Sequence, residues 1–108
     1  MLGGISQAAT YVWSGAASNG IYGDSGNWTV NSSPNGYYPQ HSVNDDAIIG
    51  QNAGTITWST DQDFFGATNT IQIGSGSTLV FSTSVGDLNV NSITQEGNAH
   101  FVFESTQA

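Results

Sequence analysis

The stretch that decides the fold runs from residue 48 to residue 103. It reads as three similar passages: IIGQNAGTITWSTDQDFFGATNT (48–70), IQIGSGSTLVFSTSVGDLNVNS (71–92) and ITQEGNAHFVF (93–103). The passages begin with Ile48, Ile71 and Ile93, then have an apolar residue at Ile56, Leu79 and Phe101, and an aromatic one at Trp58, Phe81 and Phe103. The starting isoleucines lie 23 and 22 residues apart. A repeat period in the twenties is typical of stacked β repeats, and one passage alone has nothing to bury its apolar face against.

Within a passage, polar and apolar residues alternate as they do in a half-buried strand. Thr55, Thr57 and Ser59 are interleaved with Ile56 and Trp58, so one face of the strand is polar and the other apolar. The sequence therefore predicts an all-β fold, a short β-solenoid (parallel β-helix) of about three coils. The competing fold is an antiparallel β-sandwich or jelly roll, which also uses short strands and frequent turns.

The composition excludes several classes of function. The chain of 108 residues has no lysine or arginine, eight acidic residues and a net charge of −8. Nucleic-acid binding and attraction to an anionic membrane are therefore not expected. Cysteine is absent, which excludes disulfides and zinc–thiolate sites. Gly, Ser, Thr and Asn make up 49 residues, a composition that favours strands and turns and suits an extracellular or cell-surface protein.

The region before the repeats has a different character. Residues 1–10 are small and polar and are expected to form a flexible arm, residues 11–46 an aromatic cap, and residues 47–108 the solenoid repeats. Short strands are predicted at Thr10–Trp13 and Asn27–Val30, because both are rich in aromatic and β-branched residues.

Four short motifs carry a resemblance to a known family. They are Trp13-Ser14-Gly15, Gly26-Asn27-Trp28, Pro39 and Asp46-Ala47-Ile48. Together they resemble the opening of bacterial exported parallel β-helix proteins of the autotransporter-passenger type, over roughly residues 11 to 103. The resemblance implies that the tryptophan-rich opening caps the first coil and that many more coils follow. With about three coils, the chain is expected to be a fragment of a longer protein or a subunit whose exposed end is covered by another copy.

The acidic residues offer weak candidates for a calcium site. Calcium prefers oxygen ligands, and Asp24, Asp45 and Asp46 together, or Asp61 and Asp63 on one strand face, could supply them. The known calcium-loop signatures are absent. A solvated turn is the favoured interpretation of Asp61 and Asp63, and Asp46 is expected to hold the backbone where the first coil begins.

The sequence shows no catalytic constellation. His41 and His100 are far apart in sequence, and His100 is expected on the outer face of the last strand. Because no serine lies in a nucleophile elbow and basic groups are absent, the chain is not expected to be an enzyme.

The aromatic residues have two interpretations. Tyr11, Trp13, Tyr22, Trp28, Tyr37, Tyr38 and Trp58 could form a platform for sugar rings or a core that closes the first coil. The cap is favoured. The predicted assembly and cap residues are Trp13, Trp28, Tyr37, Tyr38, Phe101 and Phe103.

These observations predict a structural extracellular protein that self-assembles. The last coil would meet the cap of another copy, head to tail, in a filament. The alternative is a carbohydrate-binding or adhesin module, or a fragment of a larger exported β-helix protein. Nucleic acid and membrane insertion are excluded as partners, and calcium is the one cofactor left open.

Overall fold

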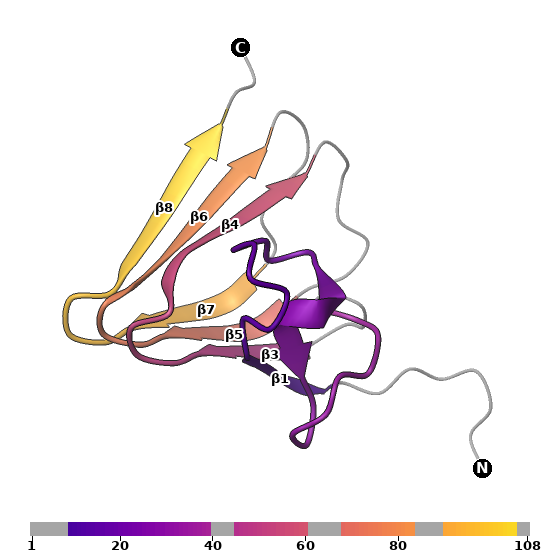
Figure 1. The fold of residues 1–108 in the computed structure, drawn as a ribbon. Helices are drawn as coiled ribbons and strands as arrows, with labels where there is room; N and C mark the ends of the chain where they lie inside the picture. The colour runs from indigo at the N-terminus through magenta and orange to yellow at the C-terminus, as the bar shows by residue number, and fades with distance from the viewer. Residues whose placement is uncertain (1–8, 40–44, 61–67, 84–89, 106–108) are drawn as a thin grey trace.

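The computed structural model describes residues 9–39, 45–60, 68–83 and 90–105, and nearly all regular structure in it is β (Figure 1). The elements are β1 (Thr10–Trp13), a 3₁₀ turn η1 (Ser25–Asn27), β2 (Trp28–Thr29), β3 (Asp45–Ile49), β4 (Gly54–Thr60), β5 (Thr68–Ile73), β6 (Ser77–Thr83), β7 (Val90–Gln95) and β8 (His100–Ser105). They form one sheet of order β2-β1-β3-β5-β7 and a second of order β4-β6-β8. The predicted all-β class is confirmed.

From β3 onward, consecutive strands alternate between the two sheets, and each is parallel to its neighbours within its sheet. β3 pairs with β5 and β5 with β7, while β4 pairs with β6 and β6 with β8, all in parallel. The pair β1–β2 is antiparallel. We call the strand pairs β3–β4, β5–β6 and β7–β8 the first, second and third rungs. An antiparallel sandwich would require antiparallel neighbours throughout, so this pairing argues against it.

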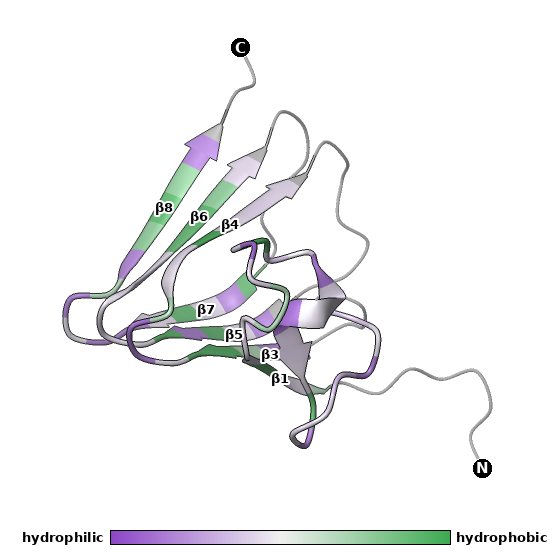
Figure 2. Cartoon of the chain, viewed as in Figure 1, coloured by the Kyte–Doolittle hydropathy of each residue, from purple (hydrophilic) through white to green (hydrophobic). Residues whose placement is uncertain are grey.

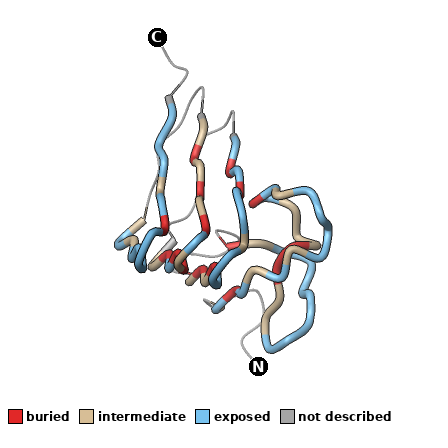
Figure 3. The backbone as a smooth tube through the Cα atoms, turned by 60° about the vertical axis from the view of Figure 1, so that its left-hand side comes forward, coloured by how far each residue is buried: buried red, intermediate tan, exposed pale blue. Residues whose placement is uncertain are grey.

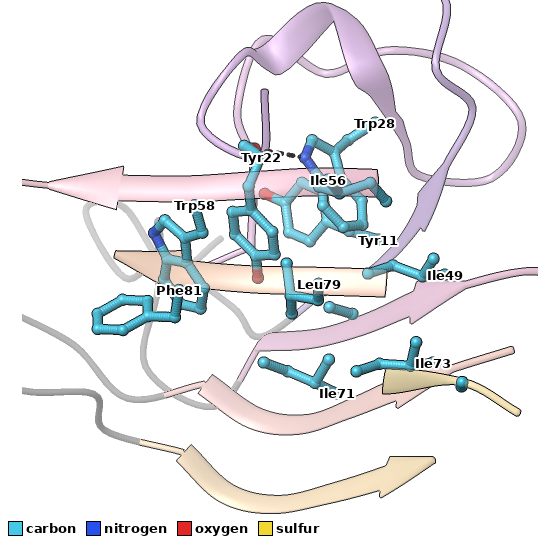
Figure 4. Packing of buried hydrophobic residues seen from close by; sticks show 12 residues of the cluster. Tyr11, Tyr22, Trp28, Ile49, Ile56, Trp58, Ile71, Ile73, Leu79 and Phe81 are labelled. Carbon is cyan, nitrogen blue, oxygen red and sulfur yellow. Dashed lines mark hydrogen bonds between the residues drawn. The ribbon is translucent and has the colours of Figure 1, made fainter. Parts of the chain in front are cut away.

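The register of the second sheet agrees with the alignment of the repeats. Ile56 lies beside Leu79 and Leu79 beside Phe101, while Trp58, Phe81 and Phe103 form a second row. Ile56, Trp58, Leu79 and Phe81 are buried, and Figure 4 shows Trp58 and Phe81 lying together beside the Tyr22 ring. The predicted placement of these rows is confirmed.

In the first sheet, the prediction is wrong by one residue in the first rung. Ile71 and Ile93 are partners as expected, but Ala47 lies beside Ile71, and Ile48 lies beside Gln72. The register offset between rungs one and two is 24 residues in the first sheet and 23 in the second. The corner between β3 and β4 therefore holds one residue more than the next corner. Asn52 lies in this corner with φ of +58° and donates its backbone N–H to Ser75 O at 2.9 Å.

The corners of the first two rungs stack closely. A Cβ at Gly74 would lie 2.6 Å from the carbonyl carbon of Gly50, so a glycine is required there. The hydroxyl of Ser77 is buried; it donates to Gly50 O at 2.7 Å and accepts from the backbone N–H of Ala53 at 2.8 Å. These contacts fix the spacing between successive corners.

A row of polar side chains crosses the first sheet from rung to rung. The Oδ1 atom of Asp46 accepts hydrogen bonds from Asn69 Nδ2 at 3.0 Å and Thr70 Oγ1 at 2.8 Å. Asn91 Nδ2 in turn donates to Asn69 Oδ1 at 3.0 Å. Side-chain hydrogen bonds therefore join successive strands of the first sheet, as the backbone hydrogen bonds do.

Candidate functional site

At the N-terminal end of the molecule, chain segments cover the outer strand of each sheet. In the first sheet, β2 pairs with β1 through Val12–Thr29 and Trp13–Trp28. In the second sheet, residues 20–22 lie along β4: Tyr22 N donates to Thr57 O at 2.9 Å, and Thr57 N to Gly20 O at 2.8 Å. The chain itself thus pairs with the outer strands at Val12, Trp13 and Thr57, where a further strand would otherwise bind.

Trp28 lies at the centre of this covered end. Its side chain is fully buried, and its Nε1 donates to Tyr22 O at 2.7 Å (Figure 4). The rings of Tyr11, Trp13 and Tyr22 meet it edge-on, with centroids 6.5, 5.1 and 4.9 Å away. Edge-to-face contacts of this kind add to the stabilisation that burial provides. Trp13 and Trp28, both predicted cap residues, therefore lie together.

Asn27 organises the backbone around Trp28 and was not singled out by sequence reasoning beyond its place in the Gly26-Asn27-Trp28 motif. Its buried amide donates to Asn19 Oδ1 at 2.8 Å and Ile21 O at 2.9 Å and accepts from Ala17 N at 3.0 Å. Its backbone carbonyl accepts from Ser14 N at 2.7 Å. A buried amide satisfied on both sides is costly to replace. The adjacent Asn27 and Trp28 in this motif were the only sequence signal that pointed to this role of Asn27.

From this end, a column of rings passes through the core. Tyr22 stacks on Trp58 with centroids 4.0 Å apart and planes 6° from parallel. Trp58 meets Phe81 edge-on at 5.1 Å, and Phe81 stacks on Phe103 at 5.4 Å. Tyr22 takes the place next to Trp58 that Phe81 takes on its other side. Each rung therefore adds one ring to the column.

At the opposite end of the column, no described strand lies beyond β7 and β8. β7 and β8 stand at the ends of their sheets, and Phe103 is 52% exposed and Val102 38% exposed. Figure 3 shows that most residues of β8 are exposed, whereas β6 and β4 carry several buried residues. Figure 2 shows that the middle of β8 is hydrophobic. Phe101 and Ile93 are half-buried. The predicted residues Phe101 and Phe103 thus lie together, at the far end from the cap.

The other predicted cap residues, Tyr37 and Tyr38, differ from each other. Tyr38 is half-buried and meets the Tyr22 ring edge-on at 6.1 Å, whereas Tyr37 is 47% exposed. Tyr11, Tyr22, Trp28 and Trp58 are all buried in the core. Sugar binding needs exposed ring faces, so the buried rings argue for the cap interpretation.

The hydroxyl of Tyr22 is a polar group at the end of an otherwise apolar contact. It is buried and has no hydrogen-bond partner. Burial raises the pKa of the Tyr22 phenol well above its ordinary value, and Tyr38 and Asp45 add smaller contributions in the same direction. The group is therefore neutral at ordinary pH and contributes to the fold through its ring.

The three described calcium candidates are each held by hydrogen bonds. Asp24 Oδ1 accepts from Gly26 N at 2.9 Å and Oδ2 from Asn19 at 2.7 Å, and these bonds lower the pKa of Asp24. Asp45 is buried, and its Oδ1 accepts from Ala9 N at 3.0 Å.

Asp45 and Asp46 are neighbours in β3 and therefore point to opposite faces of the sheet. Asp45, rather than Asp46, is the side chain that accepts from the backbone at the start of the first rung. Over residues 9–39, 45–60, 68–83 and 90–105, no three carboxylate or imidazole groups lie close enough to hold a metal ion. Asp61, Asp63 and His41 lie outside these ranges. His100 is exposed on β8, as predicted.

Comparison with known proteins adds no relative. No family model, no curated protein and no solved structure matches this chain. The resemblance of the Trp13-to-Ile48 motifs to exported β-helix proteins stays a hypothesis. In the described part of the chain, no helix has the length and apolar character needed to cross a membrane.

Proposed function

We propose that this chain is a structural β-solenoid of about three coils, closed by a tryptophan-rich N-terminal cap, which associates with other copies through its open last coil. One observation carries the proposal: the column of rings is closed by Trp28 at one end, and at the other end it stops at the half-exposed Phe103. An open strand edge with an exposed apolar row pairs readily with another strand. The scarcity of ionisable side chains suited to catalysis supports a structural role.

An extracellular or cell-surface location belongs to this proposal. A chain without cysteine, lysine or arginine and rich in Gly, Ser, Thr and Asn suits a repetitive surface module that relies on backbone pairing for its stability. Secretion or surface labelling in the source cell, measured with an antibody against the folded protein, tests the location separately.

Self-association is tested by sedimentation velocity and electron microscopy from low micromolar to submillimolar concentration. The proposal expects particles larger than a monomer that grow more abundant with concentration. It also expects more association at higher salt, because salt screens the repulsion between copies that each carry a net charge of −8. Monomers at every concentration and salt would refute the proposal. Head-to-tail filaments, the arrangement favoured by the sequence, would be visible directly in the micrographs.

In the alternative proposal, this chain is part of a larger β-helix protein. A further coil of the same polypeptide would then pair with the open edge of the last coil. In that case a version extended by such a coil would stay monomeric where the present chain associates. Of the seven candidate rings, Tyr37 is exposed, Trp13 and Tyr38 are half-buried and the other four are buried, so carbohydrate binding is supported mainly by Tyr37. Retention on glycan arrays that is lost in Tyr37→Ala would favour it.

A further inference from the structure

The two ends of the molecule are not equivalent partners for each other. At the N-terminal end, β2 pairs with the outer side of β1, and residues 20–22 pair with the outer side of β4. A strand arriving from another copy would first have to displace these segments. At the other end, β8 is the last strand of its sheet, and no described segment pairs with its outer side. The most accessible partner for β8 is therefore the β8 of another copy.

The sequence of β8 is suited to this pairing. In an antiparallel pair of two β8 strands centred on Val102, His100 lies opposite Glu104 of the other copy and Phe101 opposite Phe103. Residues directly opposite each other in an antiparallel pair lie on the same face. Each imidazole N–H can then donate to a carboxylate on the outer face. The phenylalanine rings meet on the inner face.

The two strands that end the sheets differ in what they expose. Val102 and Phe103, the exposed large hydrophobic residues of this end, both belong to β8. In β7, the exposed residues are Asn91, Ser92, Thr94 and Gln95, all of which hydrogen-bond well to water. Burial of apolar surface therefore favours association through β8 over association through β7.

We propose that two copies associate tail to tail through antiparallel β8–β8 pairing, on a twofold axis at Val102. This rests on the proposed function and specifies its partner surface. The second sheets of the two copies join into one sheet of order β4-β6-β8-β8-β6-β4. A twofold contact uses the same surface on both copies and closes on itself, so it gives a dimer and not a filament. With one strand per copy, the interface is small and the dimer is weak.

The first experiment places a like charge on the twofold axis. In Val102→Lys, two ammonium groups face each other in the dimer, so the dissociation constant measured by sedimentation equilibrium rises at least about tenfold. Val80→Lys is the matched control, because Val80 lies beside Val102 in register but on the middle strand of the sheet. It should leave the dissociation constant unchanged. Circular dichroism establishes that both variants are folded.

The second experiment tests the antiparallel register. His100→Glu places Glu opposite Glu in its own dimer, and Glu104→His places His opposite His. Each variant alone should dimerise more weakly than the wild type. An equimolar mixture restores a Glu–His pair at both positions, so it should form heterodimers with an affinity near that of the wild type.

The outcomes separate the dimer from the more general proposal. Filaments in electron microscopy would overturn tail-to-tail pairing and leave self-association standing. A dimer that Val102→Lys does not weaken, or variants whose mixture does not recover, would likewise overturn it. A wild-type chain that remains monomeric under all conditions would refute both.

Discussion

Aromatic residues lie at both ends of this molecule, but they are buried at one end and exposed at the other. Trp28 at the N-terminal end is fully buried and contacts three aromatic rings, while Phe103 at the other end is 52% exposed. Trp28 and Phe103 lie at opposite ends of the same column of rings. The difference lies in the backbone: segments of the chain fold over β1 and β4, whereas β7 and β8 are left as sheet ends. In the described residues, the stacked strands are thus covered at one end and exposed at the other.

The largest expected effect comes from truncating the ring at each end. Trp28→Ala removes a fully buried side chain and the Tyr22 hydrogen bond, so unfolding should become easier by about 3–5 kcal/mol. Phe103→Ala removes a half-exposed ring, with a cost of about 1 kcal/mol. Urea denaturation at a protein concentration where the chain is monomeric measures both. Equal costs at the two ends would contradict the contrast between them.

Between the ends, the corners of the first and second rungs should respond differently to the same change. Gly74→Ala forces a methyl group against the backbone of Gly50 and Gln51, which should cost about 2 kcal/mol. Gly50→Ala is the control, because a Cβ there meets nothing within 4 Å, and it should cost less than about 0.5 kcal/mol. Thermal unfolding of the two variants and the wild type measures both costs. A harmless Gly74→Ala would show that the corners are not in contact.

Removal of the Tyr22 hydroxyl should raise the stability of the fold, whereas the substitutions above lower it. Tyr22→Phe keeps the ring stacked on Trp58 and removes a buried group without a hydrogen-bond partner, so it should stabilise the fold by about 1 kcal/mol. Chemical denaturation of the variant beside the wild type measures the gain. A loss of stability would mean that the hydroxyl has a function at the capped end beyond packing.

The smallest effect concerns the half-buried Asp24, whose carboxylate accepts a hydrogen bond from Gly26 N at the start of η1. Hydrogen bonds from Asn19 and then Gly26 lower its pKa in the folded chain. The stabilisation is therefore present above the ordinary pKa of 3.8 and is lost as the pH falls through the lowered, folded value.

Asp24→Asn removes the charge and keeps an acceptor. The variant should be slightly less stable than the wild type at neutral pH, and the two melting temperatures should converge in strong acid. A difference in melting temperature that stays constant down to low pH would show that the charge is not the cause.

Parts of this structure follow from local pattern, and parts do not. The strands containing Ile56, Leu79 and Phe101 could be aligned from the sequence, because apolar and polar residues alternate in them with the same phase. The register of β3 could not, because the corner around Asn52 holds one extra residue that shifts Ile48 out of the row. The number of residues between two isoleucines does not show whether an extra residue lies in a strand or in a corner.

The presence of an aromatic cap could be predicted from the sequence, but the arrangement of its residues could not. Its tryptophans mark it in the sequence, and β1 begins and ends at Thr10 and Trp13, as predicted. The place of Tyr22 beside Trp58 was missed, because Gly20-Ile21-Tyr22-Gly23 has the composition of a turn and pairs with β4 only through tertiary contacts. The network around Asn27 depends on partners 6 to 10 residues away in the chain. Such contacts arise from the folded loop and have no periodicity.

The central claim is that the fold is closed at the cap and open at the third rung, and amide hydrogen exchange of the monomer tests it most directly. Exchange reports the free energy of local opening. The structure predicts the slowest exchange in β4, β5 and β6, slow exchange at Tyr22 and Thr57 beneath the cap, and much faster exchange along β8. Protection of β8 in the monomer equal to that of β6, or rapid exchange at Tyr22 and Thr57, would contradict the account.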